Sequence, residues 1–192
     1  MTEEERKEKI NKQQDEQYLA IGKFVVNYEH LLDAIKFKLK QICGNGEEIK
    51  ILIEAFPAIQ TIEILSNLIE WKIKEINESQ ESKKLFKRLI EDLKTLNTKR
   101  NFFVHTIWLI GWTNKDSTDV SEITGKKYLT EKKKIYKKLK TSEINDAIED
   151  CKRFYQIMYT SWTIDKNDKH FKVPPFHELY SRNNKGKWES LR

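Results

Sequence analysis

The amino-acid sequence predicts an all-α protein: a helical bundle of four to five helices, with a small β-hairpin or loop insertion after one of them. Three observations support this fold class. Only six Gly and three Pro occur among the 192 residues. Charged residues make up 34% of the chain and hydrophobic residues 38%, a composition that favours long helices over a turn-rich β architecture. Apolar residues also recur at steps of three and four along most of the chain, which is the spacing of one helix face.

The first predicted helix begins near Tyr18 and ends at Gly44-Asn45-Gly46, because glycine commonly follows a helix C-terminus. Residues 1–16 are almost all charged or amide-bearing and are expected to form a solvated lead-in to this helix. A short helix over residues 49–56 should stop at Pro57, which has no amide proton. The apolar stripe of the first helix consists of Tyr18, Ile21, Val25, Tyr28, Leu32, Ile35, Leu39 and Ile42, widened by Phe24 and Leu31.

Two more long helices and an insertion follow. One helix is expected over residues 62–76 and the next from Lys83 to His105. The segment of residues 106–130 is expected to be an insertion, since a short β-prone run precedes a stretch dense in Asn, Asp, Ser and Thr. The last helix should begin near Ser142, a suitable N-cap residue. Residues 164–192 show no helical period and are expected to form an irregular tail rich in basic and aromatic residues.

The length of the chain predicts one helical domain with a buried core, assigned to residues 17–163. The charged first residues are unlike a signal peptide, and the most apolar stretch, residues 102–112, is too short to span a bilayer. Cys43 and Cys151 have no metal-binding spacing and are expected to be reduced thiols in the core. These features predict a cytoplasmic protein with no membrane contact, no metal site and no cofactor.

The net charge of the chain neither requires nor excludes a nucleic-acid partner. The chain carries 36 Lys and Arg against 30 Asp and Glu, a formal charge of +6, which is compatible with RNA binding but does not require it. The stretch of residues 132–140 concentrates lysine and also places apolar residues at helical spacing. A solvated helix face and a track for an RNA backbone are both consistent with this stretch. The candidate RNA-binding residues are Lys99, Lys132, Lys133 and Lys134.

Arg100, Asn101 and His105 form the candidate catalytic site. The apolar stripe before them runs Phe86, Leu89, Leu93, Leu96, and its next two positions are Arg100 and Phe103. A guanidinium on a buried stripe is costly unless an anion or several acceptors meet it. Asn101 and His105 are four residues apart, so on a helix they lie one above the other. An arginine, an amide and an imidazole at the edge of an apolar face are suited to holding a phosphate group.

The spacing of Arg100 and His105 restricts how they could act together. Five residues on an ideal helix separate two side chains by roughly 140°. The two groups therefore converge on one ligand only if the helix bends or ends between them, or if a second copy of the motif faces the first. This geometry favours a dimeric site.

The arginine, the polar residue after it and the histidine resemble the Arg-polar-x-x-x-His signature of the HEPN superfamily (higher eukaryotes and prokaryotes nucleotide-binding). Arg100, Asn101 and His105 match the signature position by position, and Trp108 just after them is similar to the aromatic residue of many bacterial members. The wider resemblance covers roughly residues 18–163. It implies a metal-independent endoribonuclease that acts as a homodimer with the two motifs at the interface, commonly in antiviral defence or toxin–antitoxin systems.

The chemistry of RNA cleavage fits these residue types. The 2′-hydroxyl of RNA attacks the neighbouring phosphate, so the enzyme must supply a base, an acid and positive charge. A histidine with a pKa of about 6.5 serves as base or acid, and an arginine presents a permanently charged fork to two phosphate oxygens. Asn101 would orient the imidazole or bind an oxygen. The expected product is a 2′,3′-cyclic phosphate, and DNA, which lacks the nucleophile, should not be cut.

Simpler interpretations of the same residues remain. Arg100 could pair with a buried carboxylate or reach solvent at the helix end, His105 could be structural, and Phe102 and Phe103 are better explained as core residues than as stacking platforms for bases. Two functional alternatives follow: a module of the same superfamily that binds RNA or a nucleotide without cutting it, or a helical subunit of a larger defence complex. An uncontrolled ribonuclease would be toxic, so an antitoxin or activator protein is an expected partner.

Overall fold

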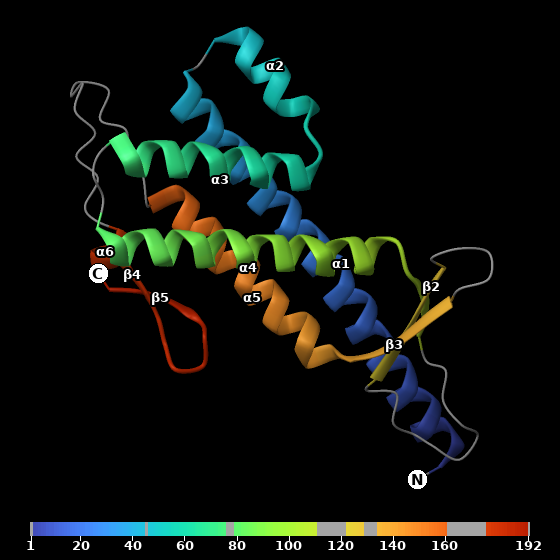
Figure 1. The fold of residues 1–192 in the computed structure, drawn as a ribbon. Coiled ribbons are helices and arrows are strands. Elements are labelled where there is room, and N and C mark those ends of the chain that lie inside the picture. The colour runs from blue at the N-terminus through green and yellow to red at the C-terminus, as the bar shows by residue number, and fades with distance from the viewer. Residues whose placement is uncertain are drawn as a thin grey trace. The chain divides into compact units, whose positions relative to one another are not determined.

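The computed structural model describes residues 2–44, 46–75, 79–110, 122–128, 134–160 and 176–191. These residues are mainly helical, as the sequence predicts, with a few short antiparallel strands (Figure 1). The helices are α1 (Glu3–Cys43), α2 (Glu47–Ala55), α3 (Ala58–Glu75), α4 (Gln80–Val104), α5 (Thr141–Thr160) and α6 (Phe176–Leu179). The strands are β1 (Ile107–Leu109), β2 (Glu122–Tyr128), β3 (Lys134–Lys140), β4 (Tyr180–Arg182) and β5 (Trp188–Ser190).

Helix α1 begins at Glu3, so the charged residues expected to precede it are its first turns. Thr2 and Glu5 form a reciprocal cap: the Thr2 amide donates to the Glu5 carboxylate over 2.7 Å, and the Glu5 amide donates to Thr2 Oγ1 over 3.2 Å. This is the capping-box arrangement of Thr and Glu three residues apart. Acidic residues in a first turn also interact favourably with the helix dipole. Local polar chemistry therefore starts the helix well before its first apolar residue.

The buried face of α1 follows the predicted stripe in its later turns, where Phe24, Tyr28, Leu31, Ile35 and Leu39 are buried, and lies one position away from it near Tyr18. Tyr18, expected in the core, is 62% exposed, whereas Gln17 is 1% exposed. The buried positions still follow steps of three and four, from Gln17 through Ala20, Phe24, Tyr28 and Leu31. The prediction was wrong only at the start of the stripe, because the buried residue there is the polar Gln17 and a search for apolar residues passes over it.

The chain divides into two compact units, each made of two separate stretches. The first unit comprises Met1–Tyr28 and Thr98–Glu149, and the second comprises Glu29–Asn97 and Asp150–Arg192. The candidate catalytic residues all belong to the first unit.

An antiparallel sheet in the order β1-β2-β3 follows α4 in the first unit, and its strand β3 lies beyond the insertion expected over residues 106–130. Ile107 pairs with Lys126, and Lys126 pairs with Tyr136. Ile123 and Leu139 lie opposite each other and are both buried, so one sheet face belongs to the core. The stretch of residues 132–140, considered above as a helix face, is therefore a strand from Lys134 onward, and α5 begins directly after it at Thr141. Ser142 thus lies within α5 instead of capping it.

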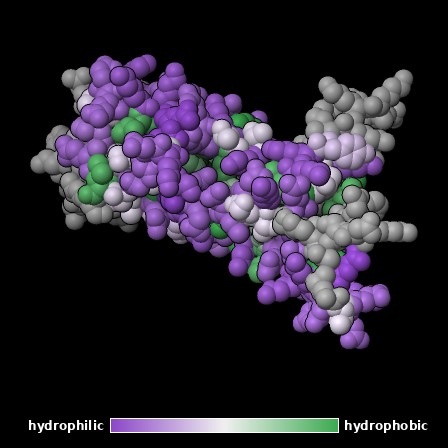
Figure 2. Space-filling view, turned by 90° about the horizontal axis from the view of Figure 1, so that it is seen from below, coloured by the Kyte–Doolittle hydropathy of each residue, from purple (hydrophilic) through white to green (hydrophobic). Residues whose placement is uncertain are grey.

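The second unit includes α2 and α3, the larger part of α4, and the C-terminal segment. Its residues 176–190, expected to be irregular, form α6 and the β4–β5 hairpin. Three contacts fasten this segment to α4: Ser82 Oγ lies 2.9 Å from His177 Nδ1, the rings of Phe86 and Phe176 stack at 4.3 Å, and the Trp188 indole donates to Asp92 over 3.0 Å. The two residues of each contact are more than 85 residues apart in sequence, so local sequence patterns cannot predict these contacts. Figure 2 shows one face of the molecule, on which the described residues are mainly hydrophilic with small separate hydrophobic patches.

Candidate functional site

The apolar stripe of α4 leads directly to Arg100. Phe86, Leu89, Leu93 and Leu96 are buried, as is Phe103 beyond the arginine, and Arg100 itself is half-buried. The Arg100 guanidinium carbon lies 5.9 Å from the ring centroid of Tyr28, which is 2% exposed. A guanidinium near an aromatic ring is attracted by the negative charge of the ring face. The arginine therefore continues the buried stripe in a half-buried position, with an aromatic ring beside it.

Aromatic rings pack against one another at the end of α4, next to Arg100, Asn101 and His105. The Phe103 ring lies 4.7 Å from the Phe24 ring and stacks on the Trp108 ring at 5.4 Å. The Phe102 ring meets Trp108 edge-on at 5.5 Å. Phe103 is buried and Phe102 is half-buried, so both belong to the packing of the first unit, in line with the simpler interpretation of these two residues. The cluster fixes the end of α4, from which the polar residues of the motif project.

Helix α4 ends at Val104, one residue before His105. The His105 amide still donates to the Asn101 carbonyl oxygen over 3.2 Å, so the helical hydrogen bonding extends to the histidine. The Trp108 indole N–H then donates to the Phe103 carbonyl oxygen over 2.8 Å, and β1 has already begun at Ile107. His105 therefore lies on a short, fixed turn between a helix and a strand, and its side chain is exposed.

The structure brings two of the three predicted catalytic residues into contact. Arg100 Nη1 donates to Asn101 Oδ1 over 3.4 Å, a long hydrogen bond. The imidazole of His105 makes no hydrogen bond or ion pair with any residue that the structure describes. The helix does end between Arg100 and His105, which is one of the conditions for their acting together. The imidazole of His105 is therefore accessible from solvent, whereas the arginine on the preceding turn is half-buried.

The four predicted RNA-binding lysines differ in where they lie and in how much of them the structure describes. Lys99 is exposed on the last turns of α4. Lys132 and Lys133 lie outside the described residues, and Lys134 begins β3 with only its backbone described. The structure adds a lysine that the sequence analysis did not single out: Lys137 Nζ lies 5.6 Å from the Phe102 ring centroid. Strand alternation in β3 would have identified it, had the segment been recognised as a strand.

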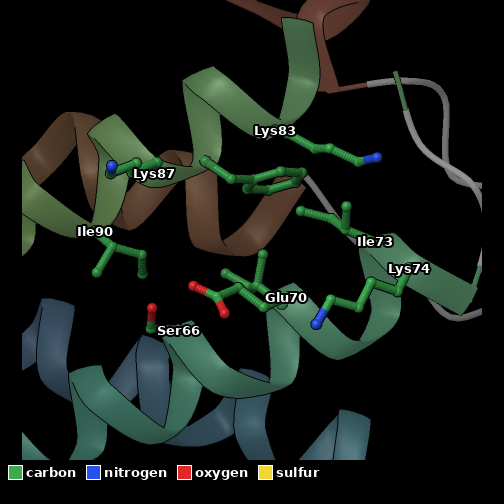
Figure 3. Close-up of a pocket in the computed structure, with 9 residues that line it drawn as sticks. Ser66, Glu70, Ile73, Lys74, Lys83, Lys87 and Ile90 are labelled. Atoms are coloured by element: carbon green, nitrogen blue, oxygen red, sulfur yellow. The ribbon is translucent and has the colours of Figure 1, made fainter. Parts of the chain in front are cut away.

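A cavity lies between α3 and α4, within the second unit (Figure 3). Its cavity measures about 400 Å³, with an apolar floor that includes Ile73, Phe86 and Ile90. Lysines rim it, but Figure 3 shows the ammonium groups of Lys83 and Lys87 pointing to opposite sides, with the Glu70 carboxylate between the helices. Because the cations do not converge and a carboxylate occupies the space between them, this cavity is a poor phosphate site.

Within the described part of the chain, no three His, Cys, Asp or Glu side chains gather as a metal site would need. None of the described helices is long and apolar enough to cross a membrane. Comparisons of the chain with models of protein families, with curated proteins and with solved structures found no match. The local geometry of the first unit is therefore the basis for a functional assignment.

Proposed function

We propose that this protein is a metal-independent endoribonuclease of the HEPN type, which cleaves RNA by attack of the 2′-hydroxyl and leaves a 2′,3′-cyclic phosphate. One observation carries the proposal: the exposed imidazole of His105 lies on a fixed turn directly after the helix that holds the half-buried Arg100. A general base or acid must be accessible to the substrate. A group that stabilises charge in the transition state works best when it is held in place and partly shielded from water.

Each residue then has a distinct role. His105 exchanges a proton with the 2′-hydroxyl or with the departing 5′-oxygen, a contribution of about 10²–10⁴-fold. Arg100 holds the phosphate oxygens, and the acceptor contact with Asn101 orients its guanidinium. One imidazole cannot be base and acid in the same step. We therefore propose a homodimer in which each protomer supplies one His105, working in the cytoplasm in antiviral defence or under the control of an antitoxin or activator.

A mixed cellular RNA pool incubated in EDTA tests this proposal. The wild-type protein should shorten the RNA and leave cyclic-phosphate ends detectable by mass spectrometry, whereas His105→Ala should not. His30→Ala is the matched control, because His30 is also an exposed histidine but lies on α1 in the second unit. It should cut as the wild type does. Cleavage that survives in His105→Ala would refute the assignment of this residue.

A non-catalytic RNA-binding module is the second candidate. The observation that favours it is the contact between Arg100 and Asn101, which does not include His105 within one chain. In this case Arg100→Ala would weaken RNA binding, and neither added activators nor high protein concentration would yield cyclic-phosphate ends. The same RNA pool, with end-group analysis at rising protein concentration, separates the two candidates.

A further inference from the structure

The β1-β2-β3 sheet has one face in the core and one face in solvent. On the core face, Trp108 pairs with Gly125 and Gly125 pairs with Lys137. Residues directly opposite one another on neighbouring strands point to the same side, and successive residues along a strand alternate. The residues one position away therefore form the other face, which we call the outer face.

The outer face consists of rows of paired residues. One row is Ile107, Lys126 and Tyr136, and the next is Leu109, Thr124 and Lys138. Glu122 and Lys140 pair beyond them. Neighbouring strands are about 4.8 Å apart, so each three-residue row is a compact platform about two strand spacings wide.

Two apolar side chains on the outer face are unusually exposed. Tyr136 is 58% exposed and Ile107 is 55% exposed, although the opposite face of the same strands packs into an aromatic core. Lys126 lies between them in the row, with its Nζ 6.0 Å from the Tyr136 ring centroid. The ring thus has a cation beside it and an open side toward solvent.

The charge on the outer face is mainly positive. Lys126, Lys138 and Lys140 point to this side, against the single carboxylate of Glu122, which lies 3.4 Å from Lys138. Lysines around an exposed aromatic ring complement a polyanion with flat apolar groups. Single-stranded nucleic acid has this chemistry, because its phosphates are charged and its unpaired bases expose their π faces. In a duplex the bases are stacked inside and cannot lie on a tyrosine.

We propose that the outer face of this sheet is a binding platform for single-stranded RNA, with one base stacked on Tyr136 beside Ile107 and with Lys126 and Lys140 neutralising the adjacent phosphates. The choice of RNA as the occupant rests on the proposed ribonuclease function. The platform lies in the same unit as Arg100 and His105, and β1 begins two residues after the histidine. It would thus make unpaired regions the substrates that are held for cleavage.

Binding is measured apart from cleavage with a fluorescently labelled 2′-O-methyl oligouridine of about 12 nucleotides, which has no nucleophile and cannot be cut. Stacking of a base on an aromatic side chain is worth about 1–3 kcal/mol, so Tyr136→Ala should raise the Kd at least about fivefold. Tyr136→Phe, which keeps the ring, should bind nearly as the wild type. The matched control is Tyr18→Ala, since Tyr18 is 62% exposed in the same unit, and its Kd should not change.

The charge contribution is tested by salt. A lysine that neutralises one phosphate of a single strand contributes about 0.7 to the slope of log K against log salt concentration. Lys126→Gln should therefore lower the slope by about this amount, and Lys12→Gln, at an exposed lysine of α1, should leave it unchanged. A perfectly paired duplex of the same length should bind more weakly than the single strand.

The outcomes for the platform and for the nuclease are separate. Normal binding by Tyr136→Ala, an equal loss in Tyr18→Ala, or tighter binding of the duplex would overturn the platform even if the protein cleaves RNA. If the expected losses occur but His105→Ala and the wild type leave RNA equally intact, the platform stands and the catalytic proposal fails. Circular dichroism of each variant checks that the binding losses do not come from unfolding.

Discussion

The indole N–H of Trp108 donates a hydrogen bond to the backbone carbonyl oxygen of Phe103 over 2.8 Å. The two rings also stack on each other at 5.4 Å. The last carbonyl groups of a helix have no partner within the helix, so the indole satisfies one of these groups at the end of α4. His105 lies between the two residues, and the shape of its turn therefore depends on one aromatic side chain.

Replacing Trp108 with Phe should keep the ring stacking and remove the hydrogen bond. The expected loss in the free energy of unfolding is about 0.5–1.5 kcal/mol, with a lower rate of RNA cleavage because His105 is held less firmly. Urea unfolding followed by circular dichroism measures the first quantity. Trp71→Phe is the control, because Trp71 is 54% exposed in α3, and an equal loss in that variant would argue against a special role for Trp108.

Gly125 permits the close approach of β2 to the aromatic cluster. A Cβ atom at this position would lie 2.7 Å from Thr106 Cγ2, 3.0 Å from the Trp108 ring and 3.1 Å from the Phe102 ring. Gly125→Ala should lower the free energy of unfolding by about 1–3 kcal/mol through overpacking. Gly22→Ala is the matched control, since a Cβ atom there meets nothing within 4 Å and alanine in a helix interior should stabilise by about 0.5–1 kcal/mol. Opposite signs in thermal melts are expected, and equal signs would contradict this account.

Arg100→Lys keeps the charge but removes the planar fork. If the guanidinium holds two phosphate oxygens in the transition state, kcat should fall by about 10²-fold or more. The free energy of unfolding should change by no more than about 1 kcal/mol, the value of an exposed to half-buried contact with the Tyr28 ring. Single-turnover cleavage of a labelled RNA distinguishes the two effects. Arg88→Lys, at a half-exposed arginine of the same helix, should cleave as the wild type.

Asp92 holds the C-terminal hairpin on α4. Its carboxylate accepts from the Trp188 indole over 3.0 Å and lies 3.2 Å from Arg182 and 3.4 Å from Arg88. Asp92→Ala would leave a buried indole N–H without its acceptor and should cost about 1–3 kcal/mol. The neighbouring Glu91→Ala, which removes an exposed ion pair with Arg88, should cost less than about 1 kcal/mol. Faster tryptic cleavage after Arg182 in the Asp92 variant alone would support this assignment, and similar rates in the two variants would oppose it.

Lys38 should make the stability of the protein depend on alkaline pH. Its side chain is 2% exposed, and burial lowers its pKa from 10.5 to about 8. The lysine therefore releases its proton more readily in the folded than in the unfolded chain, so stability is lowest below about pH 8 and rises toward the unfolded pKa. Relative to Lys38→Met, the wild type should gain about 2 kcal/mol between about pH 7 and pH 9.5. Urea unfolding of both proteins across this range measures the difference, and parallel curves would show that Lys38 does not titrate as expected.

Periodicity predicted the helices and the position of Arg100 because these depend on neighbours three and four residues away. It missed the start of α1, which depends on a polar cap between Thr2 and Glu5. Periodicity did not identify β3 as a strand, because residues four apart, such as Ile135 and Leu139, share a face both on a helix and on a strand. The α6–hairpin segment could not be predicted, since Asp92 and Trp188 are 96 residues apart.

Each unit contains a tryptophan that can serve as an optical reporter. Trp108 stacks in the aromatic cluster of the first unit, and Trp188 is 5% exposed in the second. Indole emission shifts to longer wavelength when the ring meets water, so proteins in which Trp108 or Trp188 is the only remaining one of the five tryptophans would report the melting of one unit at a time. Coincident transitions would mean that the two units unfold as a single cooperative whole. Separate transitions would mean that the turn at His105 and the C-terminal hairpin have independent stabilities.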